Sequence, residues 1–163
     1  MKNAVVLEKS SRHSKITGDF AERLVLYWLS KYGFECAYVD HTGIDIIARN
    51  PCNRELMGIS VKSRSRNVGK EEECVSLPKE NFEKAKEACR AFGCISYFAI
   101  VIDAGREINM FILPTKRLLE YFPIGKTATG WYMTKKHRER YLKDPEIIIV
   151  NFKHNILNWW KFK

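Results

Sequence analysis

The sequence predicts an α/β (α+β) domain in which a mixed β-sheet is flanked by helices. Two observations support this fold class. Helical apolar periodicity alternates with short segments of strand length, and one of those segments, residues 95–102, is apolar almost without interruption. The chain has 163 residues, 45% of them hydrophobic, which supplies enough apolar area for one core. We therefore expect a single domain spanning residues 1–163.

The first helix is predicted over residues 15–32, because large apolar side chains recur there at every fourth position. We expect Ser14 or Thr17 to cap its start and Gly33 to follow its end. The repeating residues are Ile16, Phe20, Leu24 and Trp28.

The following elements are predicted in the order β-β-β-α-β-β. The short connections between the first three strands favour a meander, and the apolar segment 95–102 is typical of a central strand. The expected ranges are 35–39, 44–48, 56–63, 78–93, 95–102 and 108–113, and a C-terminal extension then adds a helix near 115–121, a basic segment at 135–143 and a strand at 147–152.

Charge is concentrated at one end of the chain. The net charge is +9, and residues 114–163 contribute +7 of it, with 11 basic and 4 acidic side chains. Such an excess predicts a polyanion partner, DNA or RNA, with a solvated surface as the alternative. We expect a cytoplasmic protein with no membrane partner, because the sequence contains no apolar segment long enough to cross a bilayer and no signal-peptide pattern. The five cysteines have no zinc-type spacing and are expected to be reduced.

Three local features stand out as candidate chemistry: Glu22 on the first helix, Asp45 after Gly43, and Lys62 in the third strand. Helical projection places Glu22 at the rim of the buried face. Because side chains alternate along a strand, Lys62 shares its face with Ser60. A lysine inside an apolar strand must reach solvent or an anion.

These segments resemble the PD-(D/E)xK nuclease superfamily, and within it the archaeal Holliday junction resolvases and the restriction-endonuclease-like nucleases. The resemblance rests on Gly18 followed by Glu22 and Arg23, on Gly43-Ile44-Asp45, and on Ile59-Ser60-Val61-Lys62. It implies a three-layer restriction-endonuclease-like fold, with residues 1–113 as the nuclease-like core and 114–163 as a basic extension packed on it. It also implies a Mg²⁺ (or Mn²⁺) site formed by Asp45, Glu22 and the carbonyl of Val61, with Lys62, Asp45 and Glu22 as the catalytic residues.

Ser60 departs from the family pattern, because it occupies the position of the second acidic residue. A neutral hydroxyl is a weak metal ligand. Three explanations remain open: Glu22 or water fills the coordination gap, a glutamate of the next helix replaces the missing acid, or the site is inactive. The glutamates in question are Glu80, Glu83 and Glu87.

Nucleic-acid contacts are expected at two places. Near the candidate site, the residues expected to contact phosphates are Lys15, Arg23, Arg64 and Arg66. In the extension, Lys135 and Lys136 follow Gly130-Trp131-Tyr132, where aromatic rings could stack on bases. Trp159, Trp160 and Phe162 are expected to pack on the domain or to form a dimer contact.

The function that the resemblance implies is a metal-dependent endonuclease that hydrolyses DNA phosphodiester bonds, with branched or structured DNA as a candidate substrate. The alternatives are a catalytically inactive nucleic-acid-binding protein that retains the nuclease fold, and an interaction protein whose basic extension only keeps it soluble. A homodimer is an alternative to the monomer.

Overall fold

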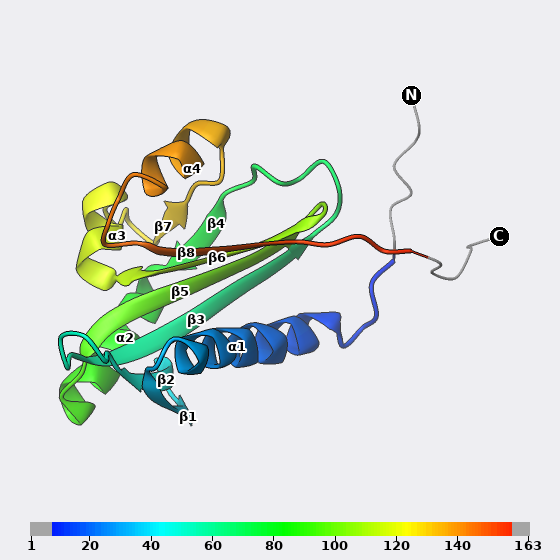
Figure 1. Cartoon of the computed structure of the whole chain (residues 1–163). Helices are drawn as coiled ribbons and strands as arrows, with labels where there is room; N and C mark the ends of the chain where they lie inside the picture. The colour runs from blue at the N-terminus through cyan, green and yellow to red at the C-terminus, as the bar shows by residue number, and fades with distance from the viewer. Residues whose placement is uncertain (1–7, 158–163) are drawn as a thin grey trace.

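The computed structural model describes residues 8–157, which form four helices and eight strands (Figure 1). The helices are α1 (His13–Lys31), α2 (Lys79–Phe92), α3 (Thr115–Tyr121) and α4 (Lys135–Tyr141). The strands are β1 (Glu35–His41), β2 (Ile44–Arg49), β3 (Leu56–Arg66), β4 (Val75–Pro78), β5 (Ile95–Ala104), β6 (Glu107–Pro114), β7 (Ala128–Trp131) and β8 (Ile148–Lys153).

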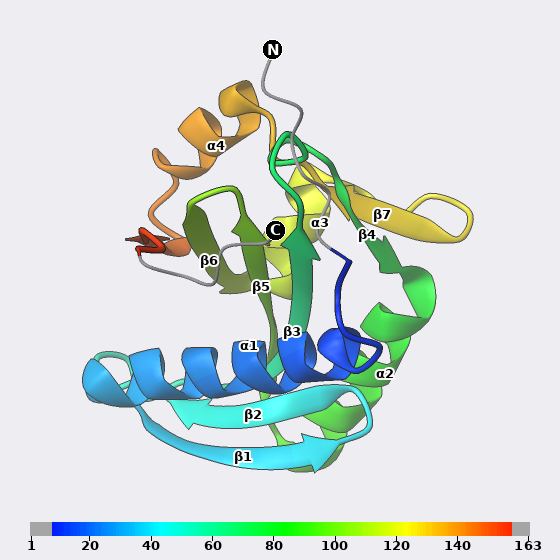
Figure 2. The ribbon, with the colours of Figure 1, turned by 90° about the vertical axis from the view of Figure 1, so that its right-hand side faces the viewer.

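Six strands form one mixed sheet in the order β1-β2-β3-β5-β6-β8. Only the β3–β5 pair is parallel, since α2 provides the crossover between them, and the other neighbours are antiparallel. Helix α1 covers one face of the sheet, and α2, α3, α4 and a small β4–β7 sheet lie on the other (Figure 2). The structure therefore confirms the predicted fold class and the antiparallel meander of the first three strands.

Strands β3 and β5 occupy the middle of the sheet, as the apolar segment 95–102 predicts. Alternate residues of β5 enter two cores: Ala99 and Val101 pack toward α1, and Phe98 and Ile100 pack toward α2. The same alternation sends Val61 of β3 toward α1. A strand buried on both faces is a rigid support for polar groups placed at its end.

Helix α1 differs from the sequence prediction at its start and along its buried stripe. Its N-cap is Arg12 with no side-chain cap, and the Thr17 hydroxyl donates to the His13 carbonyl at 2.7 Å, so the predicted cap at Ser14 or Thr17 is wrong. The buried residues are Ala21, Val25 and Leu29, while Ile16 and Phe20 are exposed. In helical projection Glu22 lies only about 20° from Leu29, nearer the buried face than the periodicity predicts.

The sequence did not predict the β4–β7 sheet, whose strands have four residues each. Trp131 of β7 is fully buried and stacks on Tyr141 of α4, with ring centroids 4.0 Å apart. It cannot stack on a nucleic-acid base, so the predicted role of Trp131 is wrong. Tyr132 beside it is exposed but stacks on His137.

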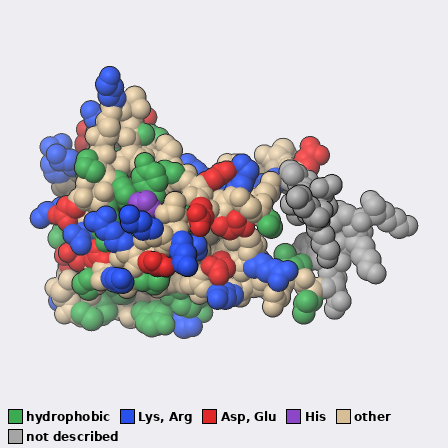
Figure 3. Space-filling view, turned by 90° about the horizontal axis from the view of Figure 1, so that it is seen from above, with side chains coloured by type: hydrophobic (Ala, Val, Ile, Leu, Met, Phe, Trp, Pro, Cys, Tyr) green, Lys and Arg blue, Asp and Glu red, His purple; other side chains and the backbone are tan. Residues whose placement is uncertain are grey.

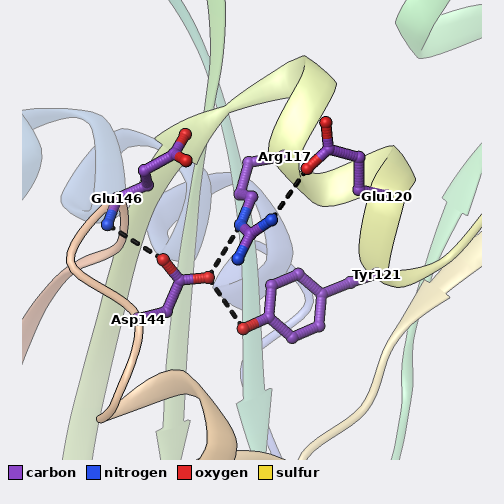
Figure 4. A network of polar contacts seen from close by, with 5 residues as sticks. All are labelled: Arg117, Glu120, Tyr121, Asp144 and Glu146. Carbon is purple, nitrogen blue, oxygen red and sulfur yellow. Dashed lines mark hydrogen bonds and ion pairs between the residues drawn. The ribbon is translucent and has the colours of Figure 1, made fainter.

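A polar network joins α3 to the segment between α4 and β8 (Figure 4). Asp144 is buried, and its carboxylate accepts hydrogen bonds from Arg117 Nε at 2.8 Å, the Tyr121 hydroxyl at 2.7 Å and the Glu146 amide at 2.9 Å. Burial opposes ionisation, but these donors lower the pKa of Asp144 below its ordinary value. The network fixes the chain where it enters β8. Across residues 8–157, no helix is both long and apolar enough to cross a membrane.

Candidate metal and nucleic-acid site

Strands β2 and β3 separate at the candidate site. Their backbone pairing ends at Ile46 opposite Ile59, although both strands continue. Beyond that pair, the side chain of Asp45 replaces the missing backbone partner: its Oδ2 accepts a hydrogen bond of 2.7 Å from the Val61 amide. The carboxylate therefore lies in the gap between the two strands, fixed by the strand that also carries Lys62.

The carbonyl of Val61 faces the same gap. In an extended strand the N–H and C=O groups of one residue point to the same side, because they pair with the same neighbouring strand. The Val61 amide points toward Asp45, so its carbonyl oxygen is directed toward that side as well. This geometry is compatible with the predicted ligand role of Val61.

Gly43 holds the start of β2 against α2. Its backbone has a φ of +99°, which favours glycine, and a Cβ there would lie 2.3 Å from the Lys84 carbonyl oxygen. No larger residue fits without moving α2 or β2. The close contact fixes the position from which Asp45 projects two residues later.

Glu22 approaches the site from α1. It is half-buried, and the Tyr38 hydroxyl of β1 hydrogen-bonds to it. Burial raises the pKa of Glu22, the hydrogen bond from Tyr38 lowers it, and the negative charge of Asp45 raises it further. Hydrogen bonding to Glu22 also raises the pKa of Tyr38 to about 12. Tyr38 was not among the predicted site residues, and its effect on the pKa of Glu22 links β1 to the site.

Lys62 completes the group of charged side chains. Burial lowers its pKa, while the carboxylates of Asp45 and Glu22 raise it. Burial likewise raises the pKa of Asp45, whereas the hydrogen bond from the Val61 amide and the positive charge of Lys62 lower it. Asp45 thus acts on Glu22 and on Lys62, and Lys62 responds to both carboxylates, so charged side chains from α1, β2 and β3 influence one another here. Such mutually perturbed groups are typical of functional sites.

Ser60 is buried, with 2% of its surface exposed, and it precedes the site on the face of β3 that α2 covers. It supplies no charge to the gap. The glutamates of α2 do not compensate through buried contacts: Glu80 pairs with Lys84, Glu83 pairs with Lys79, and all three candidate glutamates are exposed. Glu22 is half-buried, and the negative charge of Asp45 raises its pKa.

The oxygen donors of the site suit a hard divalent cation. Mg²⁺ in proteins is commonly held by one or two carboxylates together with water and substrate phosphate, and Glu22, Asp45 and the Val61 carbonyl provide such a set. Among residues 8–157 there is no group of three or more His, Cys, Asp or Glu side chains that could hold a metal by themselves. The described residues thus offer two carboxylates and a backbone carbonyl, fewer protein ligands than a closed metal site has.

A cleft of about 640 Å³ lies between the chain entering α1 and the end of β3, and Lys62 of the charged group lines it. Lys62 and Arg64 line one side of it, and Lys9 and His13 line the other. His13 Nε2 is 2.9 Å from the Ser65 hydroxyl, which donates to Asp103 at 3.3 Å. Lys9 and His13 were not among the predicted site residues, although the polar segment 9–15 contains three Lys or Arg side chains.

The predicted phosphate-binding residues have different surroundings. Arg64 is exposed and lines the cleft, whereas Arg66 donates to the Glu73 and Cys74 carbonyls and so holds the loop after β3. On α1, Lys15 pairs with Asp19, and Arg23 lies over the Tyr38 ring at 4.2 Å.

The basic extension is a mixed surface rather than a uniformly cationic one. Lys135 and Lys136 are exposed on α4 and do not line the cleft. Lys135 also lies 4.0 Å from the Glu139 carboxylate. Seen from the α4 side, acidic and basic side chains alternate over the surface (Figure 3). Any contribution of these lysines to DNA binding would be made outside the cleft.

Comparisons with known proteins give structural similarity alone. No protein-family model matches the chain, and no curated protein does. Among solved structures, Hjc of Archaeoglobus fulgidus, a Holliday junction resolvase from an archaeal hyperthermophile, is 22% identical with a TM-score of 0.55 and covers 76% of this chain and 88% of its own. The bacterial homing endonuclease I-Ssp6803I is 11% identical with a TM-score of 0.47, covering 76% and 80%. The similarity to Hjc confirms the expected restriction-endonuclease-like fold.

Proposed function

We propose that the protein is a metal-dependent endonuclease that hydrolyses DNA phosphodiester bonds, with four-way junctions and other branched DNA as its preferred substrates. The observation that carries the proposal is the convergence of Glu22, Asp45 and Lys62 where β2 leaves β3, beside a cleft lined by cations. The fold shared with Hjc adds support for the class, and the name of that protein motivates the choice of junction substrates.

The role proposed for each residue follows from its surroundings. Glu22, Asp45 and the Val61 carbonyl would hold Mg²⁺ or Mn²⁺, which when bound supplies Lewis-acid polarisation of a phosphoryl oxygen. Lys62 would hydrogen-bond the attacking water and stabilise the charge that develops on the phosphate. Arg64 and Lys9 would hold phosphates next to the cleaved bond. Hydrolysis then adds water across one P–O bond, with a proton passing to the departing oxygen.

The buried, neutral Ser60 favours a second candidate function. A protein with one acidic ligand fewer than the family pattern could bind nucleic acid through the same cleft without cutting it. This alternative retains the phosphate contacts of Arg64 and Lys9 but assigns no catalytic role to Asp45 or Lys62.

Cleavage assays separate the two functions. The full chain is incubated with supercoiled, single-stranded and four-way-junction DNA in Mg²⁺ or Mn²⁺, beside Asp45→Asn and, as a matched control, Asp19→Asn, which removes an exposed carboxylate of α1. We expect metal-dependent cutting that Asp45→Asn abolishes and Asp19→Asn retains. Binding without cutting, equal in all three proteins, would establish the non-catalytic alternative, and failure to bind at low salt would reject both.

The cleft itself is tested by salt dependence. Each phosphate contact contributes about one to the slope of log affinity against log salt. Arg64→Ala is expected to reduce this slope by about one, whereas Lys86→Ala, on the exposed side of α2, should leave it unchanged. If wild type and Arg64→Ala have equal slopes of log affinity against log salt, the DNA does not contact Arg64 and binds outside the cleft.

A further inference from the structure

A groove lies over the small β4–β7 sheet, next to α3 and α4 (Figure 1). It has a volume of about 430 Å³, within the range of about 300–1000 Å³ that small-ligand sites in proteins have. Small residues of the two strands, from the face that points away from the core, line it together with aromatic rings. The small residues are Cys74, Ser76, Ala128 and Gly130, and the rings include Phe122 and Tyr132.

Tyr132 provides the groove with an aromatic ring that is both fixed and exposed. The ring stacks on His137, with centroids 5.3 Å apart, and lies 4.9 Å from the Phe122 ring. The backbone carbonyl of Tyr132 accepts a hydrogen bond of 2.8 Å from the hydroxyl of the buried Tyr141. Tyr132 nevertheless has 41% of its surface exposed. Because its neighbours already hold this ring, little conformational entropy is lost when a second flat ring stacks on it.

Gly130 keeps the groove open beside this ring. A Cβ built on its backbone would overlap the Cys74 sulfur and lie 3.3 Å from the Tyr132 ring. A side chain at this position would therefore displace the ring or β4. A glycine inside a strand often marks a place where a ligand or another backbone approaches closely, and here it preserves the space next to Tyr132.

Two arginines of β3 lie along the edge of β4 and connect the groove to the cleft. Arg64 Nη2 donates to the Ser76 carbonyl at 3.4 Å, and Arg66 donates to the Cys74 carbonyl at 2.9 Å. Ser76 and Cys74 also line the groove, so only the strand β4 separates these cations from it. Arg64 also lines the cleft. A nucleotide whose phosphate contacts Arg64 would therefore lie next to the groove.

The charges and hydrogen bonds around the groove favour a nucleobase over a peptide as its occupant. The described residues that line the groove include no acidic side chain, and the nearby cations attract phosphate. A peptide that adds to β4 as a strand needs free carbonyls along its edge, but the carbonyls of residues 73, 74 and 76 accept hydrogen bonds from the two arginines. Cations beside an exposed aromatic ring are typical of sites for single strands, because phosphates contact the cations while unpaired bases stack on the ring.

We propose that the groove binds one unpaired base of a DNA strand that lies in the cleft, and that this base stacks on Tyr132. The inference rests on the proposed function for the presence of DNA in the cleft, but it does not require cleavage. A base inside a continuous duplex must first be unstacked and unpaired before it can enter a pocket. The groove would therefore favour single strands, and branch points with unpaired bases, over continuous duplex.

Fluorescence anisotropy of the full chain with a labelled oligothymidine, in EDTA, tests the proposal without cleavage. We expect Tyr132→Ala to weaken binding about 5- to 150-fold, as the loss of one stacked base does. Tyr132→Phe retains the ring and should bind like the wild type. Tyr27→Ala, which removes an exposed tyrosine of α1 outside both the groove and the cleft, is the control and should also bind like the wild type. Circular dichroism and thermal unfolding establish that each variant is folded.

A strand without bases identifies the contact that Tyr132 makes. Wild type and Tyr132→Ala should bind an oligonucleotide of abasic sites equally, because its phosphates remain and its bases are absent. A Tyr132→Ala variant that binds oligothymidine like the wild type, or that loses the same affinity for both strands, would overturn the proposal. Free thymidine monophosphate that competes as well as the oligonucleotide would also overturn it, because the groove would then be a site for free nucleotides.

The abasic strand also separates failure of this inference from failure of the proposed function. Arg64→Ala should weaken binding to the abasic strand, since Arg64 is proposed to contact phosphate. An abasic strand that binds wild type and Arg64→Ala equally would count against DNA in the cleft, and so against both proposals. A normal effect of Arg64→Ala together with no effect of Tyr132→Ala would count against the base groove alone.

Discussion

The Asp45 carboxylate accepts a hydrogen bond of 2.7 Å from the backbone amide of Val61, at the point where the β2–β3 ladder ends. The bond has two consequences. It places a carboxylate between the two strands, and it implies that the Val61 carbonyl faces the same gap. A structural interaction thereby creates an oxygen-rich opening beside Lys62. The geometry of the site depends on this one contact more than on any other.

The contact of Gly43 with α2 predicts an unequal effect of two similar substitutions. Gly43 and Gly69 both have positive φ, +99° and +89°, but a Cβ at Gly43 meets α2 and a Cβ at Gly69 meets nothing within 4 Å. We expect Gly69→Ala to cost about 1 kcal/mol of unfolding free energy and Gly43→Ala at least about 2 kcal/mol more, measured by urea unfolding. Equal losses would show that β2 is not held in this way.

The stability of the metal-free protein is expected to depend on pH through Asp45. Its pKa is raised in the folded chain, chiefly by burial, so the folded state retains a proton that the unfolded chain has lost. Stability from this group is therefore present at low pH and is lost as the pH rises from the ordinary carboxyl value through the folded pKa. The Asp45→Asn variant has no titratable carboxyl group at this position, so its stability lacks this contribution to the pH dependence.

Urea unfolding between about pH 4 and pH 7 measures the difference. The unfolding free energy of Asp45→Asn should fall less over this range than that of the wild type, while Asp19→Asn, from an exposed position, should follow the wild type. Parallel curves for Asp45→Asn and wild type would contradict a raised pKa at Asp45.

Lys62 is expected to act on catalysis rather than on binding. Removing one group that stabilises transition-state charge lowers rates by about 100- to 1000-fold. Lys62→Met should reduce single-turnover cleavage by this factor and change DNA affinity by less than about threefold, with no loss of stability, because it removes a charge whose burial is unfavourable. Lys84→Met, on the exposed surface of α2, is the control. A parallel loss of affinity and rate would assign Lys62 to substrate binding.

Glu22 is expected to supply the carboxylate that Ser60 lacks. It is half-buried beside Asp45, whereas Glu80 is exposed and paired with Lys84. Glu22→Gln should therefore lower metal-dependent cleavage at least about 100-fold, and Glu80→Gln should change it by less than about threefold. The reverse pattern in the cleavage assay would mean that the missing acid comes from α2.

The elements that could be predicted best from the sequence are those with a long apolar repeat or a long apolar segment. The 19-residue α1 and the first three strands follow from apolar spacing, and β5 follows from its continuous apolar segment. The four-residue strands β4 and β7 carry too little periodicity to predict, and their pairing depends on contacts between distant segments. The burial of Trp131 could not be predicted for the same reason, because it depends on packing against aromatic rings of other elements, Phe111 of β6 and Tyr141 of α4.

The candidate site was only partly predictable. Motif spacing singled out Glu22, Asp45 and Lys62, but only the folded chain shows that their charges act on one another. Tyr38 carries no distinguishing signal in the sequence. The opposite wall of the cleft, at Lys9 and His13, comes from a polar segment that periodicity treats as a loop.

Titration of the full chain with Mn²⁺ by isothermal calorimetry tests the central claim most directly. Two carboxylates with raised pKa values must lose protons to hold the ion. We therefore predict one site in the wild type and in Asp19→Asn, with proton release that is larger at pH 6 than at pH 8. Binding should be at least about tenfold weaker in Glu22→Gln and undetectable in Asp45→Asn. Equal binding by wild type and Asp45→Asn, or no binding by either, would contradict a metal site built on Asp45.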